Sequence, residues 1–148
     1  MLRDQFSSFF NQSNSIALGV CNGCQMMSNL KSIIPGADKW PKFVKNLSDQ
    51  FESRVVTVKI PKNKSIFFNE MENSYIPVIT AHGEGRAYFS KSNDLKEMIQ
   101  KEQITLQYVT NNHEVTTIYP LNPNGSVDGV TGFTNDDGRF NIMMPHPE

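Results

Sequence analysis

The sequence predicts an α/β fold built around a mixed β-sheet, in a single domain. Two observations carry this prediction. Apolar runs of strand length alternate along the chain with segments whose apolar residues recur at helical spacing. One of these runs also passes into a helix through a glycine-flanked turn at Cys21, a connection typical of α/β sheets. A chain of 148 residues with 38% hydrophobic composition is large enough to bury one such core.

The first fifty residues are expected to hold two helices and one strand. Three phenylalanines at helical spacing predict an amphipathic helix over residues 3–11. The apolar run 15–20 predicts a buried strand, and a helix over 22–30 follows it. The segment 39–49 is expected to be an ordered loop whose Trp40 and Phe43 pack against the core.

The rest of the chain is expected to be mostly strand. Residues 51–60 alternate with a period of two, which places Arg54, Val56 and Val58 on one face. Short turns punctuate the later segments, including an asparagine turn at 111–112, a strong turn at 122–126 and an Asp-Asp-Gly turn at 136–138. The further predicted elements are strands 75–81 and 86–89, a helix over 93–101, a hairpin of 104–109 with 114–119, and a hairpin of 130–134 with 139–144.

Composition and charge argue against several function classes. The formal net charge of −1 gives no electrostatic case for binding nucleic acid or an anionic membrane. No apolar stretch approaches the roughly 18 residues of a membrane span, and no basic-then-apolar leader is present. Two cysteines three positions apart cannot form a disulfide scaffold, which agrees with a reducing compartment. A cytoplasmic protein without nucleic-acid or membrane partners is predicted.

Cys21 has the sequence context of an activated nucleophile. It lies between the predicted strand and helix, with Gly19 two residues before it and Gly23 two residues after. This is the cysteine form of the G-x-S-x-G nucleophile elbow, a strained turn in which close neighbours leave no room for a β-carbon. A cysteine is nucleophilic as its thiolate, and a helix N-terminus or a histidine beside it favours that form.

The segment Pro145-His146-Pro147-Glu148 offers the base for such a nucleophile. The two prolines keep the chain extended, so His146 and Glu148, at i and i+2, point the same way. Glu148 can then accept a hydrogen bond from one imidazole nitrogen while the other faces the thiol, which is the arrangement of a catalytic triad. The last predicted strand carries this pair to its carboxyl end, where sites assemble in α/β sheets.

The chain resembles the triad-type, or class I, glutamine amidotransferases. Within them it is most similar to the C-terminal glutaminase domain of the large formylglycinamidine ribonucleotide synthases of purine biosynthesis. The resemblance covers nearly the whole chain. Cys24 and the segment 40–48, which contains Trp40, favour the large single-chain form over the small separate glutaminase subunit of the same pathway. The segments that carry it are residues 19–25, 40–48, 51–54, 82–86, 119–126 and 145–148. It implies a three-layer, flavodoxin-like amidotransferase fold with a mixed sheet, of which residues 1–148 are a domain incomplete at both termini.

The resemblance also implies a role for six residues. Cys21 would be the nucleophile, His146 the base and acid, and Glu148 the group that orients His146. Gln25 would line the glutamine pocket, and the backbone N–H of Asn22 would bind the oxyanion. His82 ends a segment that holds the two ends of the substrate, although Ala81 stands where the family often has serine.

No metal or cofactor is expected in this domain. The implied partner is a synthetase domain of the same polypeptide, which would use ATP and Mg²⁺ and the ammonia released from glutamine. Because the family domain is longer at both ends, the chain by itself is expected to be poorly soluble and to have little glutaminase activity.

Three alternatives are compatible with the same residues. Cys21 and Cys24 have the C-x-x-C spacing of a thioredoxin-like redox pair. Cys21, Cys24, His82 and His146 are of the residue types that bind zinc. Finally, the chain as an inactive fragment would serve only to dock to a partner domain.

Overall fold

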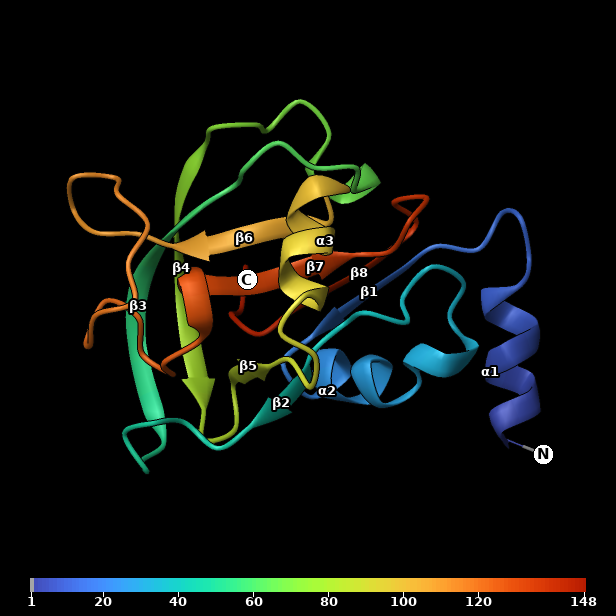
Figure 1. Ribbon diagram of the computed structural model, residues 1–148, viewed down its shortest axis with the longest axis horizontal. Helices are drawn as coiled ribbons and strands as arrows, with labels where there is room; N and C mark the ends of the chain where they lie inside the picture. The colour runs from blue at the N-terminus through green and yellow to red at the C-terminus, as the bar shows by residue number, and fades with distance from the viewer. Residues whose placement is uncertain (1) are drawn as a thin grey trace.

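The computed structural model describes residues 2–148, which form a curled, mixed six-stranded sheet with helices packed around it. The strand order is β1-β8-β7-β6-β3-β4, in which β1 and β8 are parallel and the other neighbours antiparallel. The strands are β1 (Ala17–Val20), β3 (Glu52–Lys59), β4 (Tyr75–His82), β6 (Ile104–Tyr108), β7 (Val130–Thr134) and β8 (Phe140–Met143). The predicted α/β class with a mixed sheet is confirmed (Figure 1).

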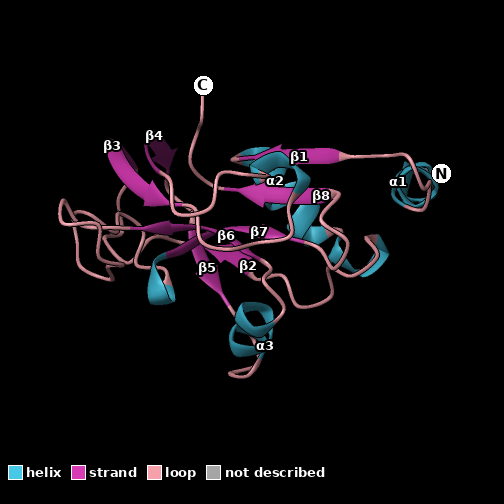
Figure 2. Cartoon of the chain, turned by 90° about the horizontal axis from the view of Figure 1, so that it is seen from above, coloured by secondary structure: helices cyan, strands magenta, loops and turns pink. Residues whose placement is uncertain are grey.

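Among the described residues, three α-helices accompany the sheet. They are α1 (Leu2–Phe10), α2 (Asn22–Asn29) and α3 (Asp94–Gln100). Seen from above, α2 lies beside β1 and β8, whereas α3 lies on the far side of a second, two-stranded sheet (Figure 2). That sheet pairs β2 (Lys42–Val44) with β5 (Arg86–Tyr88).

The core consists of two neighbouring apolar clusters. The larger one gathers side chains from α1, α2, α3, β7 and β8, and it includes Trp40, which is 1% exposed and donates from Nε1 to the Thr134 carbonyl. Phe43 packs against Phe133. The smaller cluster lies between β3, β4, β6 and β8 and includes Val56 and Val58. The predicted packing roles of Trp40 and Phe43 are therefore confirmed, and Val56 and Val58 share one buried face of β3 as the period of two predicted.

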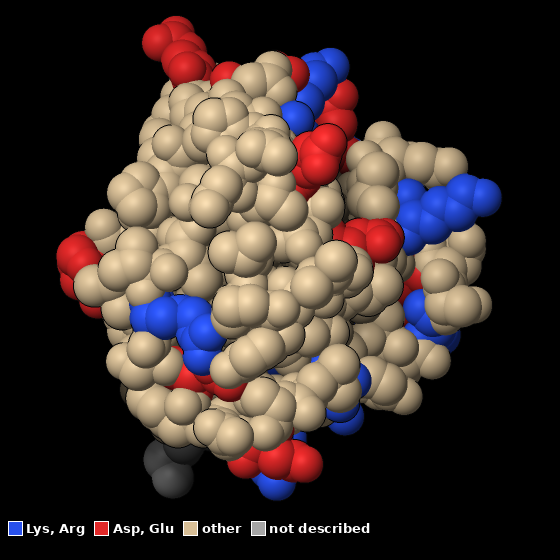
Figure 3. Space-filling model, turned by 90° about the vertical axis from the view of Figure 1, so that its left-hand side faces the viewer, with Lys and Arg blue, Asp and Glu red and all other residues tan. Residues whose placement is uncertain are grey.

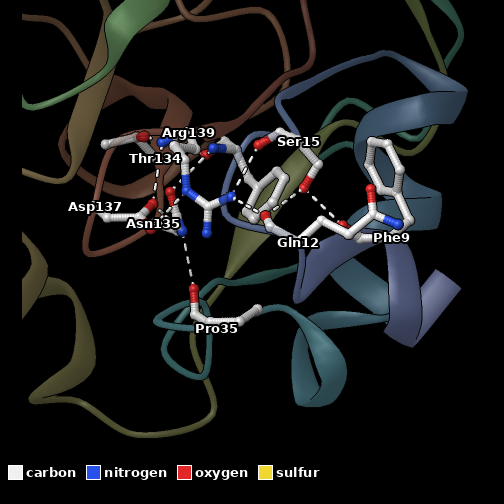
Figure 4. A network of polar contacts seen from close by, with 9 residues as sticks. Phe9, Gln12, Ser15, Pro35, Thr134, Asn135, Asp137 and Arg139 are labelled. Atoms are coloured by element: carbon white, nitrogen blue, oxygen red, sulfur yellow. Dashed lines mark hydrogen bonds and ion pairs between the residues drawn. The ribbon is translucent and has the colours of Figure 1, made fainter.

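Arg139 fixes the entry to the first strand. Its guanidinium donates from Nη1 to the carbonyls of Gln12 at 2.7 Å and Ser15 at 2.9 Å, and from Nε to Asp137 at 2.8 Å (Figure 4). These contacts join the segment between α1 and β1 to the turn between β7 and β8. They hold in place the start of the strand that leads to Cys21.

Three predicted features differ in the structure. The segment 114–119 is not a strand, because only Val115 bridges to Val109, and the Asn122 side chain holds the Thr116 carbonyl in a loop. The segment 39–49 contains β2, which gains its strand conformation by pairing with β5, 42 residues further along the chain. The strand predicted to be buried is instead at the sheet edge, and Leu18 is 41% exposed.

Candidate active site

Cys21 occupies a strained turn between β1 and α2. Its backbone has φ 51° and ψ −109°, which a non-glycine residue rarely adopts, and it forms the N-cap of α2. The turn is held at both sides, because the Cys21 N–H donates to the Met143 carbonyl of β8 and its carbonyl accepts from Gln25 N. Such strain costs about 1–3 kcal/mol and is typical of functional positions. The thiol of Cys21 is half-buried.

The two glycines around Cys21 have different roles. A β-carbon on Gly19 would lie 2.7 Å from both the Gly23 carbonyl oxygen and the Met27 sulfur, so this glycine allows β1 and α2 to approach closely. Gly23 has no heavy atom within 4 Å of the corresponding position. The prediction that close neighbours exclude a β-carbon is confirmed for Gly19 and wrong for Gly23.

His146 and Glu148 lie on a C-terminal segment that is attached to β4. The His146 N–H donates to the Ile79 carbonyl at 2.7 Å, and its carbonyl accepts from Ile79 N at 3.2 Å. His146 Nδ1 lies 2.8 Å from Glu148 Oε1. This contact lowers the pKa of the Glu148 carboxyl, and it leaves Nε2 as the free nitrogen of the ring. The i, i+2 geometry predicted for this pair is the geometry observed.

Cys21 and His146 both lie against the same stretch of β4. The Cys21 thiol faces the Ala81 carbonyl, with Sγ 3.9 Å from the oxygen, and Ala81 is two residues from Ile79, to which His146 is bound. No hydrogen bond joins the Cys21 thiol to the His146 ring, both of which are described in full. Such contacts are often long in a free enzyme and tighten when substrate binds.

The loop after β4 is held from three directions. The Asn46 side chain donates to the His82 carbonyl at 2.8 Å and accepts from Gly85 N at 3.0 Å. Asn124 Nδ2 donates to the Gly85 carbonyl at 2.8 Å. Gln25 Nε2 donates to the Glu84 carbonyl at 2.8 Å. The loop is thereby fixed beside the first turn of α2, close to Cys21.

His82 is buried beneath this loop as a neutral imidazole. It is 4% exposed, and burial, followed by the nearby His146, lowers its pKa to about 4, while Glu52 acts in the opposite direction. A β-carbon on Gly85 would lie 2.1 Å from the His82 ring, so only glycine leaves room for the ring. The His82 ring therefore packs directly against Gly85 of the loop.

The structure brings together the six residues predicted for the site. Asn22 is the first residue of α2, where backbone N–H groups have no partner inside the helix. Gln25 lies one turn later on the same helix. Three further residues, Asn46, Glu52 and Asn124, organise the site without having been assigned a role from the sequence. Each belongs to a segment that carries the family resemblance, but their contacts depend on pairings 30 or more residues apart.

The metal and redox alternatives gain no support from the geometry. Across residues 2–148, no group of three or more His, Cys, Asp or Glu side chains could hold a metal ion, so the four proposed zinc ligands do not converge. Cys24 is fully buried, and burial together with neighbouring Cys21 raises the pKa of its thiol well above the usual value. It packs as a small apolar residue in the larger core cluster.

None of the described helices is long and apolar enough to span a membrane.

Comparison with known proteins agrees with this geometry. A family model described as the CobB/CobQ-like glutamine amidotransferase domain matches residues 1–148. Among solved structures, the chain is similar to PurLQS from Thermotoga maritima, with a TM-score of 0.72 and 22% sequence identity. The match covers 99% of this chain and 57% of the Thermotoga chain. The similarity confirms the predicted flavodoxin-like amidotransferase fold.

Proposed function

Because the chain belongs to the CobB/CobQ-like glutamine amidotransferase family, we propose that it is the glutaminase part of a formylglycinamidine ribonucleotide synthase. One observation carries this proposal. Cys21 lies in a strained elbow at the start of α2, and the His146–Glu148 pair is bound to the strand that the thiol faces. The similarity to PurLQS supports the assignment to purine biosynthesis.

The proposed reaction begins with loss of the Cys21 proton to Nε2 of His146. The thiolate then attacks the side-chain amide carbon of glutamine, and the carbonyl oxygen becomes an oxyanion. The unpaired N–H groups at the start of α2, with Asn22 first, are suited to bind that oxyanion. Glu148 accepts from Nδ1 and so stabilises the imidazolium that forms.

Ammonia leaves when His146 returns its proton to the amide nitrogen. This step breaks the C–N bond and leaves a glutamyl thioester on Cys21. His146 then takes a proton from water, which attacks the thioester and releases glutamate and the free thiol. Gln25, whose side chain donates to the Glu84 carbonyl, and the loop above His82 would orient the substrate.

The released ammonia is proposed to serve a synthetase domain. That domain would use ATP and Mg²⁺ to activate formylglycinamide ribonucleotide, which ammonia converts to the amidine. The implied arrangement is a synthetase domain in the same polypeptide. The chain spans 57% of the length of the Thermotoga chain that it matches.

Substitution of the two cysteines tests the proposal. In the complete protein that carries these residues, Cys21→Ala removes the nucleophile, so glutamine hydrolysis should fall by at least about 1,000-fold. Conversion of formylglycinamide ribonucleotide to the amidine with added ammonia in place of glutamine should continue. Cys24→Ala is the matched control, because it removes a buried thiol three residues away without touching the nucleophile. Glutamine hydrolysis that persists in Cys21→Ala would rule out the proposed mechanism.

A further inference from the structure

Three buried side-chain atoms beside the candidate site have no hydrogen-bond partner within the protein. They are Oε1 of Glu52, Nε of Arg54 and Nδ1 of His82, and residues 2–148 contain no other atom of this kind. Glu52 is 2% exposed and His82 4% exposed. Buried polar atoms are nearly always paired, so three unpaired ones in one place call for a common partner.

The three side chains share one face at the end of β3 and β4 that borders the site. Glu52 and His82 lie directly opposite each other in the antiparallel ladder, and Arg54 follows Glu52 at i+2. Arg54 pairs with the other carboxylate oxygen of Glu52 through Nη2. Its guanidinium also lies over the Tyr119 ring, 5.0 Å from the centroid. This outer contact holds Arg54 in place next to Glu52.

Asn124 determines which nitrogen of His82 carries the proton. The Asn124 carbonyl oxygen accepts from Ser126 N at 3.0 Å and from Ser126 Oγ at 2.7 Å, which fixes the orientation of the amide. Its Nδ2 donates to the Gly85 carbonyl at 2.8 Å and to the Tyr108 hydroxyl at 3.2 Å, and it also lies 3.2 Å from His82 Nε2. An amide nitrogen has no acceptor to offer, so a hydrogen bond between these two atoms requires His82 Nε2 to be the acceptor. Since the ring is neutral, its proton is on Nδ1. The three unpaired atoms are thus two donors, on Arg54 and His82, and one acceptor, on Glu52.

We propose that these three atoms share one buried water molecule, and that Glu52 acts through it and His82 as a positioning residue for glutamine hydrolysis. The water accepts from Nδ1 of His82 and from Nε of Arg54, and it donates to Oε1 of Glu52. Three hydrogen bonds are what a buried water typically makes. This inference rests on the glutaminase function proposed above.

The position of His82 explains how the cluster reaches the site. His82 follows Ala81, whose carbonyl faces the Cys21 thiol, and it precedes the loop whose Glu84 carbonyl holds Gln25. A shift of the His82 ring would therefore move the wall of the glutamine pocket. Cys21, His146 and Glu148 make no hydrogen bond to Glu52 or Arg54, so a substitution of Glu52 removes no direct contact of these three residues.

Glu52→Gln in the complete protein tests the positioning role. Glutamine hydrolysis, measured as kcat/KM, should fall roughly 10- to 100-fold, the effect typical of residues that orient a reactive group from behind. Alkylation of Cys21 by iodoacetamide, which needs the thiolate but no glutamine pocket, should stay within about twofold of wild type. Ser53→Ala, on the exposed face of the same strand, is the matched control and should change neither rate. Unchanged hydrolysis, or a parallel loss of both rates, would overturn the proposal.

Two substitutions of His82 provide an independent test if Glu52→Gln does not fold. The amide nitrogen of asparagine takes the place of Nδ1, whereas that of glutamine takes the place of Nε2. His82→Asn keeps the donor to the water and should retain at least about tenfold more hydrolysis than His82→Gln. Equal activities of the two variants would contradict the proposed water bridge.

A crystal structure of the wild-type protein tests the water site separately from catalysis. Density for one water within hydrogen-bond distance of all three atoms is expected. Direct contact between Glu52 and His82, with no density between them, would overturn the site. This outcome does not depend on glutaminase activity. A wild-type protein that holds the water but neither hydrolyses glutamine nor reacts at Cys21 would instead refute the proposed function.

Discussion

At the scale of single residues, the surroundings of Cys21 and His146 favour the proton exchange that we propose between them. Cys24 and His82 lie nearby, but burial holds both in their neutral forms: it raises the pKa of the Cys24 thiol and lowers that of His82 to about 4. His146, by contrast, is only half-buried and has a carboxylate at Nδ1. The neutral residues shape the site, and the more exposed ones are available for chemistry.

The burial of His82 makes a specific prediction for stability against pH. The folded state has a pKa of about 4 for a group whose ordinary value is 6.5, so below pH 6.5 the unfolded state takes up a proton that the folded state does not. The contribution of neutral His82 to the free energy of unfolding is fully present above pH 6.5. This contribution falls by about 3 kcal/mol as the pH drops from 6.5 toward 4. Denaturant unfolding at pH 7.5 and 4.5 should show a smaller loss for His82→Gln than for wild type. His113→Gln, at an exposed turn, serves as the control, and equal losses in all three proteins would contradict the assignment.

At the scale of elements, the elbow depends on the close approach of β1 and α2. Gly19 is the contact point, because a β-carbon there would meet the Gly23 carbonyl and the Met27 sulfur at 2.7 Å. The neighbouring Gly23 has open space at the same position. The two glycines of the motif therefore provide a matched pair of substitutions.

Gly19→Ala should distort the elbow, whereas Gly23→Ala should leave it intact. Overpacking of this kind costs about 1–3 kcal/mol, and a shift of the Cys21 turn should lower glutamine hydrolysis further. Gly23 lies within a helix, where alanine is the better helix former by roughly 1 kcal/mol. Thermal unfolding and hydrolysis rates of both variants measure the difference. Equal effects at the two positions would show that the close approach of β1 and α2 is unimportant.

Local patterns predicted β3, β4, α2 and the β7–β8 hairpin, because each has its own periodicity or turn residues. Residues 114–119 follow a turn signal that predicted a hairpin, yet they form a loop in which Val115, Ile118 and Tyr119 are exposed. The three-residue strand β2 is formed by its pairing with β5, and no local pattern predicts it. The His146–Glu148 contact was predictable because it spans two residues, whereas the apposition of Glu52 and His82 follows from the β3–β4 register.

At the scale of the whole molecule, the surface has few charges on one face and an exposed apolar strand at the opposite edge of the sheet. The face that includes β3 and β4 carries only scattered charges (Figure 3). At the other side of the sheet, β1 pairs with β8 alone among the described strands. Leu18 of β1 is 41% exposed beside an apolar hollow of about 440 Å³, which α1 and α2 also line. An exposed apolar edge strand favours self-association.

Residues 1–148 produced alone should therefore associate in a concentration-dependent way and show little glutaminase activity. Leu18→Lys places a charge on the edge strand and should shift the chain toward monomer in sedimentation velocity experiments. Leu47→Lys changes a leucine that is 65% exposed on the loop between β2 and β3, and it should have little effect. A wild-type chain that stays monomeric at high concentration would contradict the role assigned to the β1 edge.

The most direct test of the central claim is to find where a glutamine-like electrophile becomes attached. The complete protein would be treated with diazo-oxo-norleucine, digested, and its peptides sequenced by mass spectrometry. The site described here predicts one equivalent of label on Cys21, protection by glutamine, and strong slowing of labelling in Glu148→Ala, which removes the group that orients His146. Label on Cys24, or no label on Cys21 in a protein that hydrolyses glutamine, would contradict the assignment of Cys21 as the nucleophile.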